Sequence, residues 1–148
     1  MPAYNCADYI AESIKSVQNQ SYRNWELVVA DDNSTDGTVD AVRSMAADDN
    51  RIHLLETDIN LGPTAARNRA INAAQGDYIA FLDSDDIWAP EKLSRQTAFM
   101  LENDYFFTYT DYMICMNGEW IPYVYVGPDV VDRRKMYDYC YFSTITVM

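Results

Sequence analysis

Apolar residues in the first two thirds of the chain alternate between helical spacing and short continuous runs. Ile10, Ile14 and Val17 recur at the spacing of an amphipathic helix, which we expect to begin near Asp8 as its N-cap. The apolar run from Trp25 to Ala30 follows, and its continuity is typical of a strand that is covered on both faces. The two patterns predict helices and strands that follow one another along the chain.

The same alternation continues to about residue 101. Turn-forming residues separate the segments, Asp36 is a candidate helix cap, and Pro63 suits the first position of a helix. We expect helices over 8–20, 38–47, 63–74 and 90–101, and strands over 25–30, 52–56 and 77–83. This order predicts a three-layer α/β/α fold of the Rossmann-like kind, with a mostly parallel sheet.

The pattern changes after about Asn103. Two apolar runs flank Asn117-Gly118, which predicts a pair of antiparallel strands joined by a turn. We expect these strands over 105–116 and 119–126, a short helix over 132–140 and a final strand over 142–148. The chain has no linker of low complexity and no internal repeat, so we expect a single domain over residues 1–148.

Both ends of the chain look incomplete for such a fold. The segment from Met1 to Asn5 has the character of a turn, although a doubly wound sheet usually begins with a strand. The last predicted strand ends at Met148 without a cap or tail. We therefore expect a fragment that lacks its first strand and a C-terminal region.

Composition narrows the classes of function. The balance of 11 basic against 23 acidic residues gives a net charge of −12, which argues against binding to a nucleic-acid backbone. The three cysteines are far apart without C-x-x-C spacing, so we expect reduced thiols in the cytoplasm and no zinc site. No apolar run approaches the roughly 18 residues that span a bilayer, and no signal peptide is evident.

Two clusters of carboxylates follow predicted strands. Asp31 and Asp32 end one strand, and Asp83, Asp85 and Asp86 follow another. Because ligands bind outside the carboxyl ends of parallel strands, we expect both clusters to face one crevice. Oxygen ligands suit Mg²⁺ or Mn²⁺, and magnesium usually takes one or two carboxylates and completes its shell with water and phosphate. The clusters therefore predict a metal-assisted site for a phosphate-bearing ligand.

Arg67 lies in the first turns of the helix that Pro63 opens, at the same expected edge of the sheet. Its guanidinium could contact a diphosphate or a base there. The glycine-rich cradles G-x-G-x-x-G and G-x-x-x-x-G-K are absent, so the common dinucleotide and P-loop sites are excluded. His53 is the only histidine, which leaves little for a histidine-based catalytic site.

Four motifs in this order resemble family 2 glycosyltransferases of the GT-A fold, such as those of bacterial polysaccharide and teichuronic acid synthesis. The motifs are PAYN at 2–5, NWELVVADDNSTDGT at 24–38, NLGPTAARNRAI at 60–71 and GDYIAFLDSDDIWAPEKLSRQ at 76–96. The resemblance is close from Pro2 to about Gln96 and looser to Met148. Asn33 stands where the family often has glycine, and asparagine tolerates left-handed backbone angles.

The resemblance implies a nucleoside site at the first two motifs. Pro2, Ala3 and Tyr4 match the segment that meets the nucleoside. Asp32 matches the carboxylate that holds the base, typically uracil, and Asp31 lies beside it.

The other two motifs imply a diphosphate and metal site. Arg67 matches the arginine near the base and diphosphate. Asp83, Ser84 and Asp85 match the D-x-D motif, with Asp83 near the ribose and Asp85 as the main metal ligand, and Asp86 is a weaker candidate. The implied cofactor is Mg²⁺ or Mn²⁺.

The implied reaction moves a sugar from a nucleotide-sugar donor, a UDP-sugar, to an acceptor hydroxyl with inversion at the anomeric carbon. The metal and Arg67 neutralise the departing diphosphate, and a carboxylate takes the acceptor proton. We expect that base beyond Met148, because Asp111 matches no base position. The resemblance implies an acceptor that is a saccharide or a lipid-linked saccharide of cell-surface polysaccharide synthesis, and a lipid-linked acceptor would imply a cytoplasmic protein that is peripheral at the inner membrane face.

Two other functions stay open at this point. Response-regulator receiver domains also place paired acids after one strand and an aspartate after another, with Mg²⁺ between them, and LVVADDNS at 27–34 resembles their opening strand. The chain lacks their downstream Thr/Ser and Lys pair. A non-catalytic nucleotide-binding remnant is the second alternative, and it predicts metal-dependent UDP binding without sugar transfer.

Overall fold

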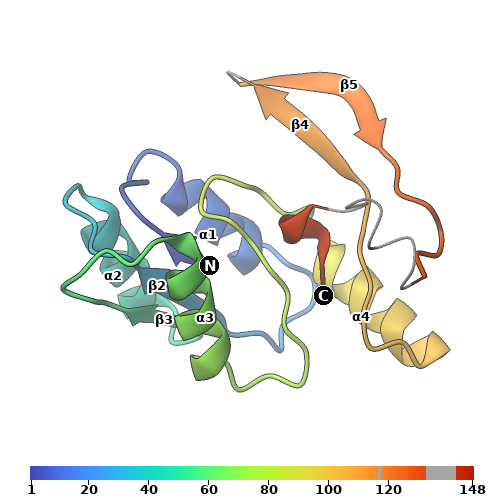
Figure 1. Cartoon of the computed structure of the whole chain (residues 1–148), viewed down its shortest axis with the longest axis horizontal. Helices are drawn as coiled ribbons and strands as arrows, with labels where there is room; N and C mark the ends of the chain where they lie inside the picture. Colours follow the sequence, from blue (N-terminus) through green and yellow to red (C-terminus); the bar gives the residue numbers. More distant parts are fainter. Residues whose placement is uncertain (117, 133–142) are drawn as a thin grey trace.

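The computed structural model of this chain describes residues 1–116, 118–132 and 143–148. A parallel sheet in the order β1-β2-β3 and a separate antiparallel hairpin β4-β5 make up its strands (Figure 1). The described elements are β1 (Pro2–Ala3), α1 (Ile10–Gln18), β2 (Leu27–Asp31), α2 (Thr38–Asp48), β3 (Ile52–Leu55), α3 (Pro63–Ala73), α4 (Lys92–Asn103), β4 (Tyr112–Met116), β5 (Glu119–Tyr125) and the 3-10 helix η1 (Thr144–Thr146).

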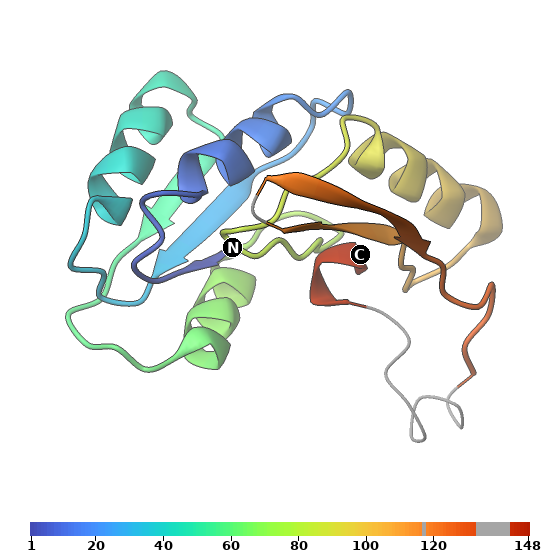
Figure 2. The same ribbon diagram turned by 90° about the horizontal axis from the view of Figure 1, so that it is seen from above.

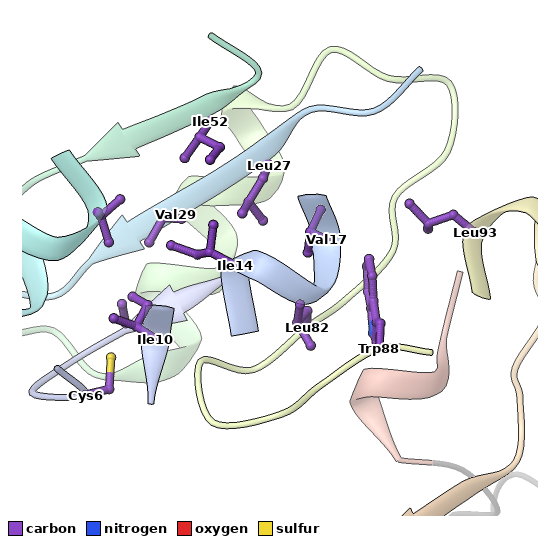
Figure 3. Close-up of a cluster of buried hydrophobic side chains, with 12 residues drawn as sticks. Cys6, Ile10, Ile14, Val17, Leu27, Val29, Ile52, Leu82, Trp88 and Leu93 are labelled. Atoms are coloured by element: carbon purple, nitrogen blue, oxygen red, sulfur yellow. The ribbon is translucent and has the colours of Figure 1, made fainter. Parts of the chain in front are cut away.

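Strand β2 is buried on both faces, as its continuous apolar pattern predicts. Leu27 and Val29 belong to one core cluster, in which α1 supplies Ile14 (Figure 3). Val28 and Ala30 point to the other face and pack against the alanines of α3. Figure 2 shows α1 and α2 on one side of this sheet and α3 on the other. The predicted three-layer α/β/α arrangement is therefore confirmed.

The four predicted helices are present, with small changes at their ends. The N-cap of α1 is Tyr9 rather than Asp8, and no side chain caps this helix. Pro63 occupies the first turn of α3, as predicted. That helix ends at Ala73 because Ala74 is already extended. Helix α4 begins at Lys92, two residues after the proline that was expected to open it.

The first residues of the chain form a strand rather than a turn. Pro2 and Ala3 pair in parallel with Ala30 and Asp31. Asn5 then leaves the strand with a positive φ of 46°. The turn-forming character of the PAYN motif begins only after this short strand.

The predicted strand over 77–83 is wrong, because this run has no regular secondary structure. The one backbone hydrogen bond found for residues 77–82 runs from Phe81 N–H to the Val147 carbonyl oxygen at 3.3 Å, as far as the described residues show. A strand needs a neighbouring strand to pair its backbone groups, and β2 has its open edge towards this run. The apolar pattern is that of a strand, but the pairing is missing.

The predicted final strand over 142–148 is also wrong within the described residues, where η1 occupies most of it. Its last residue is nevertheless paired, because Thr108 and Met148 exchange both of their backbone hydrogen bonds, at 2.9 and 3.0 Å. The Gln96 amide of α4 donates to Thr108 Oγ1 and to the Thr146 carbonyl oxygen. The predicted helix over 132–140 lies outside the described residues except for Asp132.

The predicted antiparallel pair is confirmed as β4 and β5, with β4 shorter than expected. Tyr112 lies opposite Tyr125, and their rings stack with centroids 4.9 Å apart. Gly118 of the connecting turn has a positive φ of 80°, and Asn117 lies outside the described residues. Figure 1 shows this hairpin lying apart from the three-stranded sheet.

Two further observations concern the cysteines and the length of the helices. Cys6 is buried and Cys115 exposed, both as free thiols, and Cys140 lies outside the described residues. In the part of the chain that the structure describes, no helix has the length and apolar character that crossing a membrane requires.

Candidate functional site

The acidic residue that ends β2 is almost fully buried. Asp31 is 2% exposed, and its Oδ2 accepts a hydrogen bond from the Ser34 N–H at 3.0 Å. Its Oδ1 is buried and has no partner among the described residues. Asn33 in this turn has a positive φ of 66°, a left-handed conformation that asparagine tolerates. Since buried polar atoms are normally paired, Asp31 Oδ1 is an acceptor that a ligand could use.

The second acidic residue, Asp32, fixes the loop that leads into α3. Its two carboxylate oxygens each accept the Leu61 N–H at 3.1 Å, and Oδ2 also accepts the Gly62 N–H at 2.6 Å. Gly62 has φ 88° and ψ 166°, a conformation open to glycine, and Pro63 begins the helix directly after it. Asp32 therefore ties the end of β2 to the start of α3, a role that the sequence analysis did not foresee.

Helix α3 joins the two acidic clusters. Arg67 Nη2 donates to Asp83 Oδ1 at 2.7 Å, and both side chains are about one third exposed. Two residues further along the helix, Arg69 Nη1 donates to the Asp31 carbonyl oxygen at 3.1 Å. The Nε of Arg67 is buried without a partner among the described residues. The structure thus brings Asp31, Asp32 and Asp83 to the same helix, α3.

The D-x-D motif forms a tight turn. The Asp86 N–H donates to the Asp83 carbonyl oxygen at 3.2 Å, and Ser13 of α1 donates its hydroxyl to the Ser84 carbonyl oxygen at 2.8 Å. Asp85 is exposed. Partial burial, and then the charges of Asp85 and Asp83, raise the pKa of Asp86 to about 6. Negative charge is therefore concentrated in this turn.

The turn carries carboxylates of the kind that a divalent cation takes as ligands. No group of three acidic, cysteine or histidine side chains has gathered in metal-binding geometry in residues 1–116, 118–132 and 143–148. Magnesium and manganese need only one or two protein carboxylates when phosphate and water complete the shell. Asp85 is open to solvent, and a cation beside it would offset the negative charges of Asp85 and Asp83, which add to the effect of burial on the pKa of Asp86. Asp83 and Asp85 as its ligands remain a prediction.

The predicted nucleoside segment lies beside the loop after β2. Pro2 and Ala3 form β1, and the Tyr4 side chain is 52% exposed. Asn5 accepts the Thr35 N–H at 2.8 Å with its side-chain oxygen. These contacts hold the PAYN segment against the loop that carries the acidic pair.

Asp36 adds a second link between these segments. Its carboxylate accepts the Ala7 N–H at 3.1 Å and the Thr38 N–H at 2.9 Å. The hydrogen bond from Thr38 holds the pKa of Asp36 below its usual value. Gly37 is the N-cap of α2, so Asp36 supports the start of the helix from one residue earlier. The sequence analysis missed the roles of Asn5 and Ser13, although asparagine and serine in loops commonly bond the backbone.

Comparison with known proteins agrees with this arrangement. The family model of glycosyl transferase family 2 matches residues 1–139. A putative teichuronic acid biosynthesis glycosyltransferase of Bacillus subtilis, TuaG, is 45% identical over 113 residues, which are 76% of this chain and 45% of the relative. WfgD of Escherichia coli, a UDP-Glc:alpha-D-GlcNAc-diphosphoundecaprenol beta-1,3-glucosyltransferase, is 41% identical over 148 residues, 100% of this chain and 57% of the relative. The chain thus spans about half the length of these relatives.

Solved structures show the same fold. TarS of S. aureus (residues 1–349, in complex with UDP) is 31% identical and superimposes with a TM-score of 0.72 over 82% of this chain and 36% of that chain. A mannosyltransferase from Pyrobaculum calidifontis, in complex with GDP-Man and Mn²⁺, is 33% identical with a TM-score of 0.62 over 67% of this chain and 30% of that chain. The GT-A-type fold that the motifs imply is confirmed. On the family match and the shared fold together, this chain belongs to glycosyl transferase family 2.

Proposed function

We propose that this chain is the donor-binding domain of a metal-dependent glycosyltransferase, which moves a hexosyl group from a UDP-sugar to an acceptor hydroxyl. The observation that carries the proposal is the meeting of two acidic strand-end segments at one helix. Asp32 holds the start of α3, and Arg67 of the same helix binds Asp83. Carboxylates and a guanidinium at one sheet edge suit a ligand that combines a base, a ribose and a diphosphate.

The base and ribose are assigned to the first part of this site. Asp31 and Asp32 hold the base, and the unpartnered Asp31 Oδ1 is an acceptor that the N–H of a uracil could satisfy. The exposed Tyr4 ring lies at the end of β1 beside them and meets the nucleoside. Support for a UDP donor comes from TarS of S. aureus, which has been solved with UDP and with UDP-GlcNAc.

The diphosphate is assigned to Arg67 and the D-x-D turn. Arg67 has a fixed guanidinium with an unpartnered Nε, and such a group binds phosphate oxygens in a forked geometry. Mg²⁺ or Mn²⁺ would be held by Asp85, with Asp83 and Ser84 beside the donor. When bound, this ion supplies Lewis-acid stabilisation of the diphosphate charge. The mannosyltransferase of Pyrobaculum calidifontis, described with Mn²⁺, supports this assignment.

The proposed step is a single displacement at the anomeric carbon. The acceptor oxygen forms a bond to this carbon from the face opposite the diphosphate, and the bond between the carbon and the diphosphate oxygen breaks. The electron pair of that bond leaves on the diphosphate, where Arg67 stabilises the added charge. The acceptor hydroxyl gives its proton to a base, and we assign that role to none of the residues described here.

The acceptor we propose is a saccharide carried on a lipid diphosphate, in the synthesis of a cell-surface polysaccharide. The E. coli relatives WfgD and WfaP are both named for an acceptor of this kind, and the B. subtilis relative for teichuronic acid synthesis. A lipid-linked acceptor would bring the enzyme to a membrane surface as a peripheral protein.

Calorimetric titration with UDP, GDP and TDP, each with and without Mn²⁺, tests the donor assignment. We expect UDP binding that depends on the metal. The Asp85→Asn variant should weaken UDP binding in Mn²⁺ by about tenfold or more, a loss of at least about 1.4 kcal/mol. Asp48→Asn is the matched control, because it removes one exposed carboxylate from the end of α2, away from the site.

The outcomes separate the candidate functions. If the folded protein binds no nucleotide in a metal-dependent way, the proposal is wrong. Equal binding by Asp85→Asn and Asp48→Asn would contradict the metal assignment alone. Metal-dependent UDP binding without turnover of any UDP-sugar by the full-length protein would favour the non-catalytic remnant.

A further inference from the structure

Three buried polar side chains lie in a stripe along α1 and the residues that follow it: Ser13, Ser16 and Gln20. Their spacing of three and four residues is that of one helix face, beside the apolar face that carries Ile14 and Val17. Burial of a polar group costs free energy unless the group is hydrogen-bonded. Each member of this polar stripe therefore needs a partner within the protein.

The two serines of the polar stripe bind the segment that carries the D-x-D turn. Ser13 Oγ donates to the Ser84 carbonyl oxygen at 2.8 Å, and this carbonyl belongs to the peptide bond between Ser84 and Asp85. Ser16 Oγ accepts the Trp88 N–H at 3.1 Å. The stripe thus binds the backbone within the turn itself and again a few residues after it.

Gln20 extends the same set of contacts to the start of α4. Its Nε2 donates to the Ala89 carbonyl oxygen at 2.7 Å, and its Oε1 accepts the Leu93 N–H at 3.0 Å. Nε2 also donates to the Ser16 carbonyl oxygen at 3.1 Å. The amide of this fully buried side chain therefore uses both of its hydrogens and its oxygen, which fixes its orientation.

The path of the segment between the turn and α4 depends on such contacts. Residues 83–91, all of them described, contain no helix or strand whose ladder could pair their backbone groups. Leu82 and Trp88, on either side of the turn, are buried in the core cluster that contains Val17 of α1 (Figure 3). The turn is therefore a loop with both ends packed against the core, and Ser13 binds the part between these ends.

Helix α3 holds the same turn from the other side of the sheet. Arg67 Nη2 of α3 binds the Asp83 side chain at 2.7 Å, whereas Ser13 of α1 binds the backbone at Ser84. Figure 2 shows the two helices on opposite sides of the sheet. One helix thus fixes a carboxylate of the D-x-D turn, and the other fixes the peptide that leads to its second carboxylate.

We propose that Ser13, Ser16 and Gln20 are positioning residues for donor binding, because they set the backbone path of the D-x-D turn before the ion and the diphosphate bind. This inference rests on the proposed function, in which the carboxylates of the turn meet the ion and the donor. A turn that is already formed binds more tightly than one that must be ordered, because ordering costs conformational entropy. Ser13 has the largest effect on binding, because its partner lies within the turn.

Single serine substitutions test this role. Ser13→Ala removes the hydroxyl that binds Ser84 and leaves a smaller side chain in its place. Ser21→Ala is the matched control, because the Ser21 hydroxyl also contacts α4, through Ser94, but does so at an exposed site at the far end of the segment. Ser16→Ala is a second test variant. The measurements are UDP titration in Mn²⁺ and, without nucleotide, the exchange rate of the Asp86 amide hydrogen by NMR.

The effects should decrease with distance from the turn. Ser13→Ala should weaken UDP binding in Mn²⁺ by about three- to tenfold, the usual consequence of losing one hydrogen bond. It should speed exchange of the Asp86 amide, which donates to the Asp83 carbonyl oxygen across the turn, by about the same factor. Ser16→Ala should produce smaller changes of the same kind, and Ser21→Ala none. Equal affinity of Ser13→Ala and Ser21→Ala for UDP would overturn the proposal.

A double-mutant cycle distinguishes positioning from a general loss of stability. Asp85→Asn removes the proposed main metal ligand, so in this background Ser13→Ala should change UDP affinity by less than about twofold. A merely structural role of Ser13 would lower the affinity by the same factor in both backgrounds. That result would contradict a positioning role.

Failure of the proposed function can be told apart from failure of this inference. The first shows in the unsubstituted protein, as absence of metal-dependent nucleotide binding. Exchange of the Asp86 amide needs no nucleotide, so it judges the hold on the turn independently. Faster exchange in Ser13→Ala than in Ser21→Ala supports that hold, and the same rate in both variants rules it out.

Discussion

The runs Leu27–Asp31 and Tyr78–Asp83 have the same apolar character and the same acidic ending, yet only the first is a strand. The first pairs with β3 along most of its length and with β1 at its end. Within the described part of the chain, the second has one backbone hydrogen bond to a distant segment, from Phe81 N–H to the Val147 carbonyl oxygen, and one turn bond, which the Asp83 carbonyl oxygen accepts from Asp86 N–H. An apolar run therefore becomes a strand only where partners are present on its edges.

The acidic residues at the ends of the two runs also differ, in their burial and in the groups that they bind. Asp32 is 2% exposed, and its carboxylate holds two backbone amides of the loop before α3. Asp83 is about one third exposed, and its side chain forms an ion pair with Arg67. The paired strand thus leads into a buried carboxylate that holds a loop, and the unpaired run ends in a partly exposed carboxylate in an ion pair.

The largest expected difference between the two regions is in their response to the same truncation. Ile14→Ala, in the cluster that covers β2, should lower the free energy of unfolding by about 2–5 kcal/mol, because this side chain is 0% exposed. Ile79→Ala should cost less than about 1 kcal/mol, because Ile79 is 37% exposed. Urea unfolding of both variants measures the difference. Equal losses would show that the run 77–82 is as well packed as β2.

A smaller effect, which depends on pH, is expected from the Met1 amine at the open edge of β2. Its folded pKa of about 5 lies below its unfolded value of 8.0, so the unfolded chain binds more protons between these values. The free energy of unfolding should therefore rise with pH from about 5 to about 8, by on the order of a few kcal/mol at about 1.4 kcal/mol per pKa unit.

A form acetylated at Met1 isolates this effect, because it keeps the N–H donor and removes the charge. The difference in unfolding free energy between the free and acetylated forms should be largest near pH 5 and should vanish above pH 8. Mass spectrometry confirms that Met1 is retained in the free form. A difference that does not change with pH would mean that the amine is solvated rather than buried.

Loss of the carboxylate should destabilise the protein more at Asp32 than at Asp83. Asp32→Asn should cost about 1–3 kcal/mol of unfolding free energy, because the amide keeps only one acceptor oxygen and turns an NH₂ donor towards the loop N–H groups that the carboxylate accepts. Asp83→Asn should cost about 0–1 kcal/mol, the usual range for a partly exposed ion pair. Chemical unfolding of the two variants side by side checks the order. The reverse order would show that the D-x-D turn, and not the end of β2, is the fixed part of the site.

The sequence predicts those parts of the fold that local patterns and neighbouring elements decide. Helical spacing places α1, and the continuous apolar run places β2. Asparagine at residue 33 adopts the left-handed angle that its position requires. Each of these features depends on residues within a few positions or on burial, and both leave a mark in the pattern of side chains.

The errors have a common physical cause. The runs 77–83 and 142–148 have the composition of strands, but pairing depends on segments distant in the chain. The contacts of the candidate site also depend on distant segments. Its acidic residues can be identified from the order of the motifs, but the hydrogen bond that Gly62 N–H donates to the Asp32 carboxylate joins residues 30 positions apart and leaves no local pattern. The role of each site residue in donor binding stays a prediction for the titrations above.

The paired amides of Thr108 and Met148 bear on how this chain can vary in length. Their two hydrogen bonds close a loop that contains the hairpin β4-β5 and begins where α4 is anchored by Gln96. The entropy of closing a loop grows only with the logarithm of its length, so that doubling it costs about 0.6 kcal/mol. Insertions or deletions between residues 109 and 143 should therefore leave the register of the flanking residues unchanged, which makes this loop the natural place for large changes in chain length.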